Sequence, residues 1–195
     1  MGYDGIFVTN HFIDKNFQLG AEYSYAEKLD YYCADYKKAA EIGKEVGLKV
    51  FFGFEITNQG TDFLVYGLDQ NWLLAHPEIL EQPMRQNLRL FIDEGALVIH
   101  AHPFREAGYI DHIRLYPREI HGVEVINACR KDEENKMAEL YADFYGFRRF
   151  AGSDNHIADK LQKLAGIQTE EPLNAAEELR DFFLNDKTEV FCTER

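Results

Sequence analysis

The segment RRFAGSDNHI (148–157) joins an apolar run to a polar end, where an Asp and a His stand two positions apart. Asp154 and His156 can point to the same side if the backbone stays extended, because side chains along a strand alternate with a period of two. A carboxylate and an imidazole that converge at a strand end are typical of a metal site or of an acid/base pair. The alternative is a turn, in which Ser, Asp and Asn side chains satisfy neighbouring backbone groups.

Other apolar runs precede this one, and each is expected to form a buried strand. The expected strands cover residues 5–10, 48–57, 62–69, 96–102, 121–127 and 148–153. Helical patterns predict helices at 25–46, 81–95, 133–145 and 174–186, with Gly47 after the first and Asn174 as the N-cap of the last. The segment 188–193 closes the chain. Strands that alternate with helices and read as continuous apolar runs indicate an α/β fold with a mainly parallel sheet.

Length and composition limit the class of protein. A chain of 195 residues with 46% hydrophobic residues can bury one sizeable core, so residues 1–195 are expected to form a single domain. The net charge of −13 argues against non-specific nucleic-acid binding, although bound divalent ions could still attract an anionic substrate. The three cysteines are scattered, the start of the chain lacks a signal-peptide pattern, and no apolar run is long enough to span a membrane. These features predict a cytoplasmic protein with reduced cysteines and neither a membrane nor a nucleic-acid partner.

Candidate ligands recur where the expected strands end, which is where a barrel-like β/α arrangement places its active groups. They are His11, Glu55, His102, Asp154 and His156. Each has an ordinary alternative, such as a turn or a solvated strand end, but random placement would seldom put all of them at one topological position. Mixed imidazole and carboxylate ligands suit zinc, manganese or iron, and a shared carboxylate such as Glu55 is typical of multinuclear sites. His100 stands two positions before His102 and is interpreted as a packing or supporting residue.

Segments that span much of the chain together carry a family resemblance: GYDGIFVTNH (2–11), FFGFE (51–55), VIHAHPFR (98–105) and FAGSDNH (150–156). In their order and spacing they resemble the polymerase and histidinol phosphatase (PHP) superfamily of metal-dependent phosphoesterases. The resemblance implies a distorted, TIM-like (β/α)7 barrel whose metal ions activate water against a phosphate ester. It implies metal ligation by His11, Glu55, His102, Asp154 and His156. The hypothesis of a phosphoesterase gives catalytic roles to Glu55, His102, Asp154 and Arg105. The Arg105 guanidinium would orient the phosphate, and the alternative for Arg105 is an ordinary surface salt bridge.

The sequence departs from the family pattern in several places. The family's first motif, His-x-His after the first strand, is not found ahead of the matched region, so the barrel is expected to lack its first strand and to bind fewer ions than the full set. Asn10 stands where the family usually has an Asp. Asp62 stands where many relatives carry a His at the start of the third strand, which makes it either a further metal ligand or a solvated strand end.

The leading hypothesis is a hydrolase of the PHP type, a phosphoesterase that uses zinc, manganese or iron on a small phosphorylated molecule. Two alternatives stay open: a non-catalytic or weakly active PHP-like domain with a structural or binding role, and a metal-dependent hydrolase of other substrates such as amides. A barrel without its first strand would also expose backbone near residues 6–9 and 190–193. That exposure predicts either a homodimer through the open barrel edge or a local rearrangement.

Overall fold

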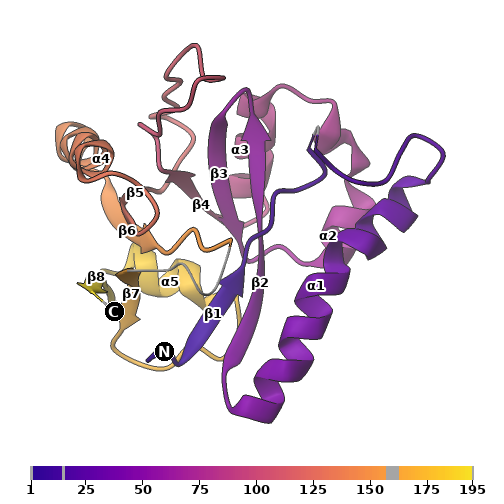
Figure 1. The fold of residues 1–195 in the computed structure, drawn as a ribbon, viewed down its shortest axis with the longest axis horizontal. Coiled ribbons are helices and arrows are strands. Elements are labelled where there is room, and N and C mark those ends of the chain that lie inside the picture. The colour runs from indigo at the N-terminus through magenta and orange to yellow at the C-terminus, as the bar shows by residue number, and fades with distance from the viewer. Residues whose placement is uncertain (1, 15, 157–162, 195) are drawn as a thin grey trace.

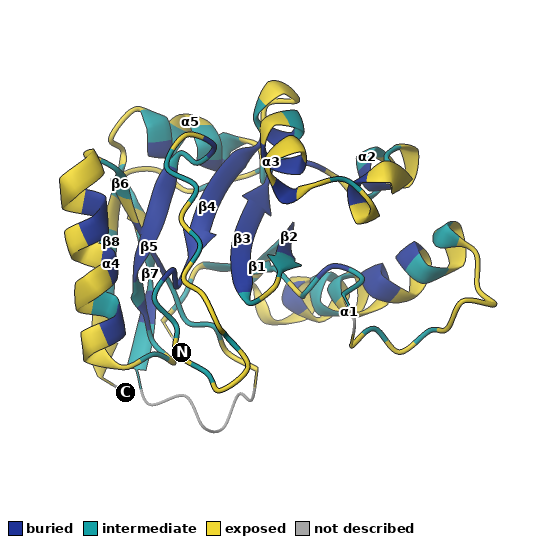
Figure 2. Cartoon of the chain, turned by 90° about the horizontal axis from the view of Figure 1, so that it is seen from above, coloured by how far each residue is buried: buried dark blue, intermediate teal, exposed yellow. Residues whose placement is uncertain are grey.

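A computed structural model describes residues 2–14, 16–156 and 163–194 (Figure 1). The fold is mixed α/β, and its centre is a six-stranded sheet that curls into a half-barrel, with strand order β1-β2-β3-β4-β5-β6. These strands are β1 (Gly5–Val8), β2 (Lys49–Asn58), β3 (Thr61–Tyr66), β4 (Leu97–Ala101), β5 (Gly122–Asn127) and β6 (Arg148–Gly152). Most of the sheet is buried between helices (Figure 2).

The sheet is less parallel than the sequence pattern predicts. β1–β2, β4–β5 and β5–β6 pair in parallel, but β2–β3 and β3–β4 are antiparallel. The reason is a two-residue turn between β2 and β3, in which Gln59 and Gly60 both have positive φ, at 53° and 81°. Such a turn matches the twist of two antiparallel strands and leaves no room for the crossover that parallel strands need. As a result, the start of β3 lies beside the end of β2, where Asp62 pairs with Thr57.

The predicted helices all form, with one exception in where a helix begins. Helix α1 (Tyr25–Val46) begins at a capping box between Ser24 and Glu27 and ends at Gly47, whose φ of 73° suits a glycine. α3 (Met84–Asp93) and α4 (Asp132–Tyr145) lie within or close to their expected ranges. The exception is α5 (Glu178–Leu184), which starts later than predicted. Asn174 is not its N-cap: its backbone N–H donates to the Glu178 carboxylate at 2.7 Å.

Alternate residues of the strands pack against different helices. In β3, Phe63 and Val65 join the core that contains α1 and α3, while Leu64 and Tyr66 join the core that contains α5. Helix α4 packs on β5 through a third cluster. A short helix, α2 (Gln70–Ala75), and a 3-10 turn, η1 (Pro77–Leu80), lie in the region between β3 and α3 for which no element was predicted.

A two-stranded ribbon follows the main sheet. Strands β7 (Lys163–Thr169) and β8 (Thr188–Glu194) pair antiparallel, and β7 was not predicted from the sequence. Tyr3, just before β1, packs its ring against Phe191 of β8 and donates its hydroxyl to the Ala165 carbonyl at 2.9 Å. Within the described residues β1 pairs only with β2, so its other backbone edge has no strand partner in the sheet. Among these residues, no helix is long and apolar enough to cross a membrane.

Candidate metal centre

Three of the predicted ligands meet where β1, β2 and β3 come together. After β1 the chain stays beside β2, where the Phe12 N–H donates to the Glu55 carbonyl at 2.7 Å and the Glu55 N–H donates to the Asn10 carbonyl at 3.0 Å. This backbone bridge places the His11 side chain next to Glu55. The antiparallel β3 adds Asp62 from the adjacent strand. Ligand atoms of His11, Glu55 and Asp62 all lie within 4.8 Å of one another.

His102 and Arg105 complete this cluster from the end of β4. Nε2 of His102 lies 3.5 Å from Oε1 of Glu55 and 3.8 Å from Oδ2 of Asp62. Nη2 of Arg105 lies 3.1 Å from Oδ2 of Asp62. The register explains this convergence, because Asp62 pairs with Ala101, the residue before His102.

The donor set of the cluster fits a divalent cation. Glu55 and Asp62 are 6% and 1% exposed, and Oε1 of Glu55 and both carboxylate oxygens of Asp62 have no hydrogen-bond partner among the residues that the structure describes. The contact of Arg105 with Asp62 is therefore an ion pair without hydrogen-bond alignment. Buried carboxylate oxygens without partners are costly, and a cation bound between them would remove that cost. The Thr57 hydroxyl lies 3.0 Å from Nδ1 of His11 and orients the ring, as partners of metal-binding histidines do.

The electrostatics of His102 also suit a cation site. Burial alone would lower the pKa of His102, but the adjacent carboxylate of Glu55 and the nearby carboxylates of Glu124 and Asp62 outweigh burial and raise the pKa to about 9. At neutral pH, without a metal, the ring therefore carries a proton. A metal ion that binds this nitrogen must displace that proton, which couples metal binding to proton release.

Asp154 and His156 approach the cluster from the end of β6. Their side chains contact each other, with Nδ1 of His156 at 3.4 Å from Oδ1 of Asp154. The rings of His156 and His11 are 6.2 Å apart between centroids. Asp154 also faces Arg130, whose Nε lies 3.7 Å from Oδ2. The structure thus brings the predicted residues into one chain of contacts, while the metal-binding role of each stays a prediction.

Sequence reasoning missed two residues of the site, Glu124 and Arg130. Glu124 is 2% exposed in the middle of β5, and its Oε2 accepts a hydrogen bond from the His102 backbone N–H at 2.9 Å. Burial raises the pKa of Glu124 to about 7. The signal in the sequence was a single carboxylate inside the apolar run GVEVIN (122–127). No pattern singled out Arg130, which follows β5 in a loop.

His100 is a packing residue, in agreement with its interpretation from the sequence. It is fully buried, and its ring stacks on Phe63 with 4.7 Å between centroids. Within the described part of the chain, neither ring nitrogen has a hydrogen-bond partner. Burial, with a smaller effect of the His102 charge, lowers the pKa of His100 to about 3, so the ring is neutral at physiological pH.

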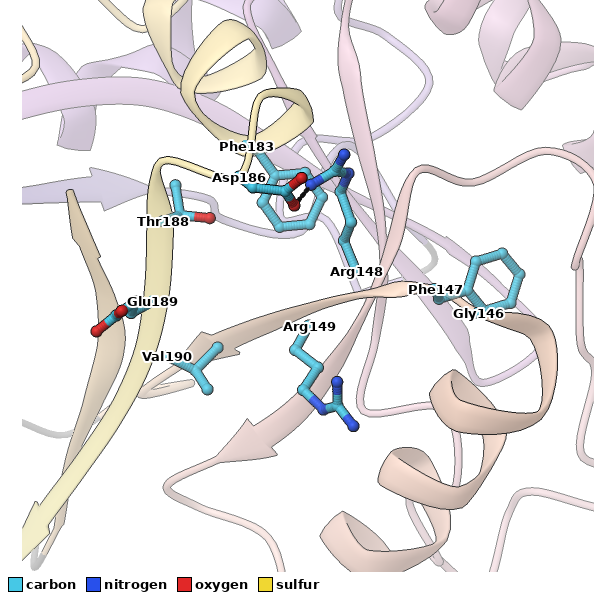
Figure 3. A pocket seen from close by; sticks show the side chains of 9 residues that line it. All are labelled: Gly146, Phe147, Arg148, Arg149, Phe183, Asp186, Thr188, Glu189 and Val190. Atoms are coloured by element: carbon cyan, nitrogen blue, oxygen red, sulfur yellow. Dashed lines mark ion pairs between the residues drawn. The ribbon is translucent and has the colours of Figure 1, made fainter. Parts of the chain in front are cut away.

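Two open pockets lie elsewhere on the molecule. One, of about 650 Å³, lies at the start of β6 and β8, at the opposite end of β6 from Asp154 (Figure 3). Its two arginines already have carboxylate partners, Arg148 with Asp186 and Arg149 with Asp143. The other, of about 710 Å³, lies between the end of α1 and the start of β2. Neither pocket is lined by a residue of the cluster of His11, Glu55, Asp62, His102 and Arg105.

Comparison with solved structures identifies the type of fold. No protein-family model and no curated protein matches the sequence. A two-domain protein from Bacteroides vulgatus, described as containing a predicted PHP-like metal-dependent phosphoesterase, matches 98% of this chain with a TM-score of 0.68 and 16% identity. The fold is PHP-like. PsfC from Pseudomonas syringae matches 97% of the chain with a TM-score of 0.58 and 13% identity. The chain spans 56% of the Bacteroides protein and 76% of PsfC.

Proposed function

We propose that this chain is a metal-dependent phosphoesterase that hydrolyses a phosphate ester of a small molecule. The observation that carries the proposal is the set of buried carboxylate oxygens of Glu55 and Asp62 that accept no hydrogen bond from the described residues and lie close to the imidazoles of His11 and His102. The PHP-like fold supports it, because the cluster lies where the strand ends converge. The proposed cofactor is zinc, manganese or iron, as the mixture of imidazole and carboxylate ligands suggests.

Each residue has a role in this proposal. Glu55, Asp62, His11 and His102 would hold a metal, and Asp154 with His156 would provide ligands on the β6 side. When bound, divalent metal supplies a nucleophile by lowering the pKa of coordinated water, and it stabilises negative charge on phosphoryl oxygens. Arg105, whose side chain is only 14% exposed, is proposed to turn from Asp62 to the substrate phosphate and bind two of its oxygens.

A second candidate function is metal-free binding of a ligand or partner. The observation that favours it is charge compensation inside the site, because Arg105 already pairs with Asp62 and Arg130 already faces Asp154. A domain with these ion pairs could remain folded without metal and bind a ligand without hydrolysing it.

Metal titration together with a phosphatase assay distinguishes the two functions. Protein freed of metal with a chelator is titrated with Mn²⁺ and Zn²⁺ by calorimetry and assayed with p-nitrophenyl phosphate. The wild type is expected to bind metal and to hydrolyse the ester only when metal is present. Glu55→Gln should lower metal affinity by at least about tenfold, on the scale seen when metal sites lose supporting groups. The exposed Glu41→Gln on α1 is the matched control and should leave affinity unchanged.

Two outcomes would overturn the proposal. Equal metal affinity in wild type and Glu55→Gln would show that the cluster is not the metal site. Absence of hydrolysis of p-nitrophenyl phosphate and of a panel of small phosphate esters, with metal present, would overturn the phosphoesterase, and absence of metal binding as well would favour the metal-free binding domain.

A further inference from the structure

Glu124 occupies an unusual place for a carboxylate. It lies in the middle of β5, between β4 and β6, and its strand neighbours Val123 and Val125 are 0% and 4% exposed. A carboxyl group buried inside a sheet is unfavourable unless its oxygens accept hydrogen bonds. Both oxygens of Glu124 lie against segments that carry candidate ligands.

The first of these segments is the turn that presents His102. Oε2 of Glu124 accepts the His102 backbone N–H at 2.9 Å. His102 has a φ of 25°, in a region that residues other than glycine rarely adopt. Such a conformation persists only where the surroundings impose it. The hydrogen bond from the His102 N–H to the buried Glu124 carboxyl group contributes to holding it here.

The second segment is the end of β6, which leads to Asp154. A Cβ atom at Gly152 would lie 2.6 Å from Oε1 of Glu124. Gly152 does not have a positive φ, so a glycine is needed here because there is no room for a side chain, not because of its backbone conformation. Asp154, two residues further on, has a φ of 47°. The Glu124 carboxyl group therefore packs against Gly152 at the end of β6, just before the turn that carries Asp154.

The third segment is the loop that carries Arg130. Oε2 of Glu124 also accepts a hydrogen bond from Nδ2 of Asn127 at 3.0 Å. The Asn127 carbonyl in turn accepts the Arg130 N–H at 3.1 Å, and its side-chain oxygen accepts the Cys129 N–H at 2.9 Å. This loop places Arg130 opposite Asp154.

We propose that Glu124 is a positioning residue, which fixes the backbone of the His102 turn and of the Asp154 turn in the geometry that binds metal. The proposal rests on the proposed function in one respect, that His102 and Asp154 are metal ligands. Glu124 itself acts through the backbone of these turns. Because its contacts do not involve a metal, it sets their geometry before metal binds.

The hydrogen bonds predict a clear difference between two variants. In Glu124→Gln the amide oxygen can take the place of Oε2 and accept from both His102 and Asn127. In Glu124→Leu both hydrogen bonds are lost, while a side chain of similar size without charge occupies the buried position. Glu124→Leu should therefore fold, but the backbone of its His102 turn should be less ordered. Glu124→Gln should keep the turn as it is in the wild type.

Two measurements test this difference. In metal-free protein, hydrogen exchange of peptides covering residues 98–105 should become about tenfold faster or more in Glu124→Leu, because the His102 N–H loses its acceptor. Titration with Co²⁺ should show about 10- to 100-fold weaker binding and an altered visible absorption spectrum in Glu124→Leu. Glu124→Gln should stay within about threefold of the wild type in both measurements, since it keeps the acceptor.

A pair of glycine variants keeps the test valid if Glu124→Leu does not fold. In Gly152→Ala the new methyl group would collide with Oε1 of Glu124 from the β6 side. This variant should also weaken Co²⁺ binding and speed up hydrogen exchange of residues 98–105. Gly108→Ala is the matched control, because a Cβ atom there meets nothing within 4 Å.

Unchanged exchange at residues 98–105 in Glu124→Leu, or in Gly152→Ala where only that variant folds, would overturn the proposal. Equal damage in Glu124→Gln and Glu124→Leu would also overturn it. Absence of Co²⁺ binding by the wild type would instead overturn the proposed function, and the metal-free exchange data would still decide the role of Glu124.

Discussion

The buried His100 predicts one contribution to the pH dependence of this protein's stability. Its ring is neutral in the folded state because burial lowers its pKa to about 3, whereas in the unfolded chain it has an ordinary value of 6.5. Between these two values the unfolded state binds a proton that the folded state does not. His100 therefore contributes full stability above pH 6.5, and this contribution is lost as the pH falls toward 3. A bound metal would lower the His100 pKa further, so the His100 contribution to stability decreases toward low pH both with and without metal.

The size of the loss follows from the two pKa values. At pH 5 the unfolded ring is almost fully protonated and the folded ring is not, which costs about 2 kcal/mol relative to pH 7.5. Since pH 5 lies well above the folded-state value, this figure depends almost entirely on the unfolded-state pKa. The variant His100→Phe keeps a ring stacked on Phe63 and removes the titrating group. Its stability should therefore fall by about 2 kcal/mol less than that of the wild type between pH 7.5 and pH 5.

Urea denaturation of both proteins at pH 7.5 and pH 5, with a chelator present, measures this difference. The free energy of unfolding is compared between pH values within each protein first, so that any change in packing caused by the larger phenyl ring cancels. A wild type and a His100→Phe variant that lose the same free energy of unfolding would refute the assignment of a neutral, buried ring to His100.

Two further predictions concern the sheet. Gly122→Ala should destabilise the protein by about 1–3 kcal/mol, because a Cβ atom there would lie 2.6 Å from the Phe183 ring and 2.8 Å from the Arg148 carbonyl oxygen. Gly108→Ala, in open space, should cost less than about 0.5 kcal/mol in the same denaturation experiment, and equal losses would contradict this reasoning. Within the described residues one backbone edge of β1 has no strand partner, which predicts self-association, so size-exclusion chromatography over a range of concentrations should show a dimer. Elution as a monomer at every concentration would exclude pairing through this edge.

Much of the fold could be predicted because local patterns agree with the tertiary structure. Helix α1 has apolar spacing, a capping box and a C-terminal glycine, and the structure gives it the expected bounds. The reversal at β3 was missed, although Gly60 in the short connection between two apolar runs was a usable signal for a hairpin. Strand β7 was missed because its alternate residues are only partly buried, so that its sequence lacks a strong apolar run.

The candidate site was predictable as a set of residues but not as a set of contacts. Strand ends identified His11, Glu55 and His102, because chemistry at strand ends follows from topology alone. The ion pair between Arg105 and Asp62 depends on the antiparallel register of β3 and β4, which no periodicity reveals. Glu124 was missed for a similar reason, since its partners belong to β4, β6 and the loop after β5.

The β2–β3–β4 meander has a consequence for the order in which the protein folds. Glu55 and Asp62 belong to one hairpin, and contacts within a hairpin close short loops, whose entropic cost is low. His156, by contrast, must come together with His11 from almost the other end of the chain, after β5 and β6 have been added. Because local contacts form faster than distant ones, the carboxylate half of the centre is expected to assemble early and the Asp154–His156 half late. During synthesis from the N-terminus, Glu55 and Asp62 would leave the ribosome before the strands that complete their surroundings. A cation bound at that stage would stabilise the native hairpin while the rest of the chain is still being made.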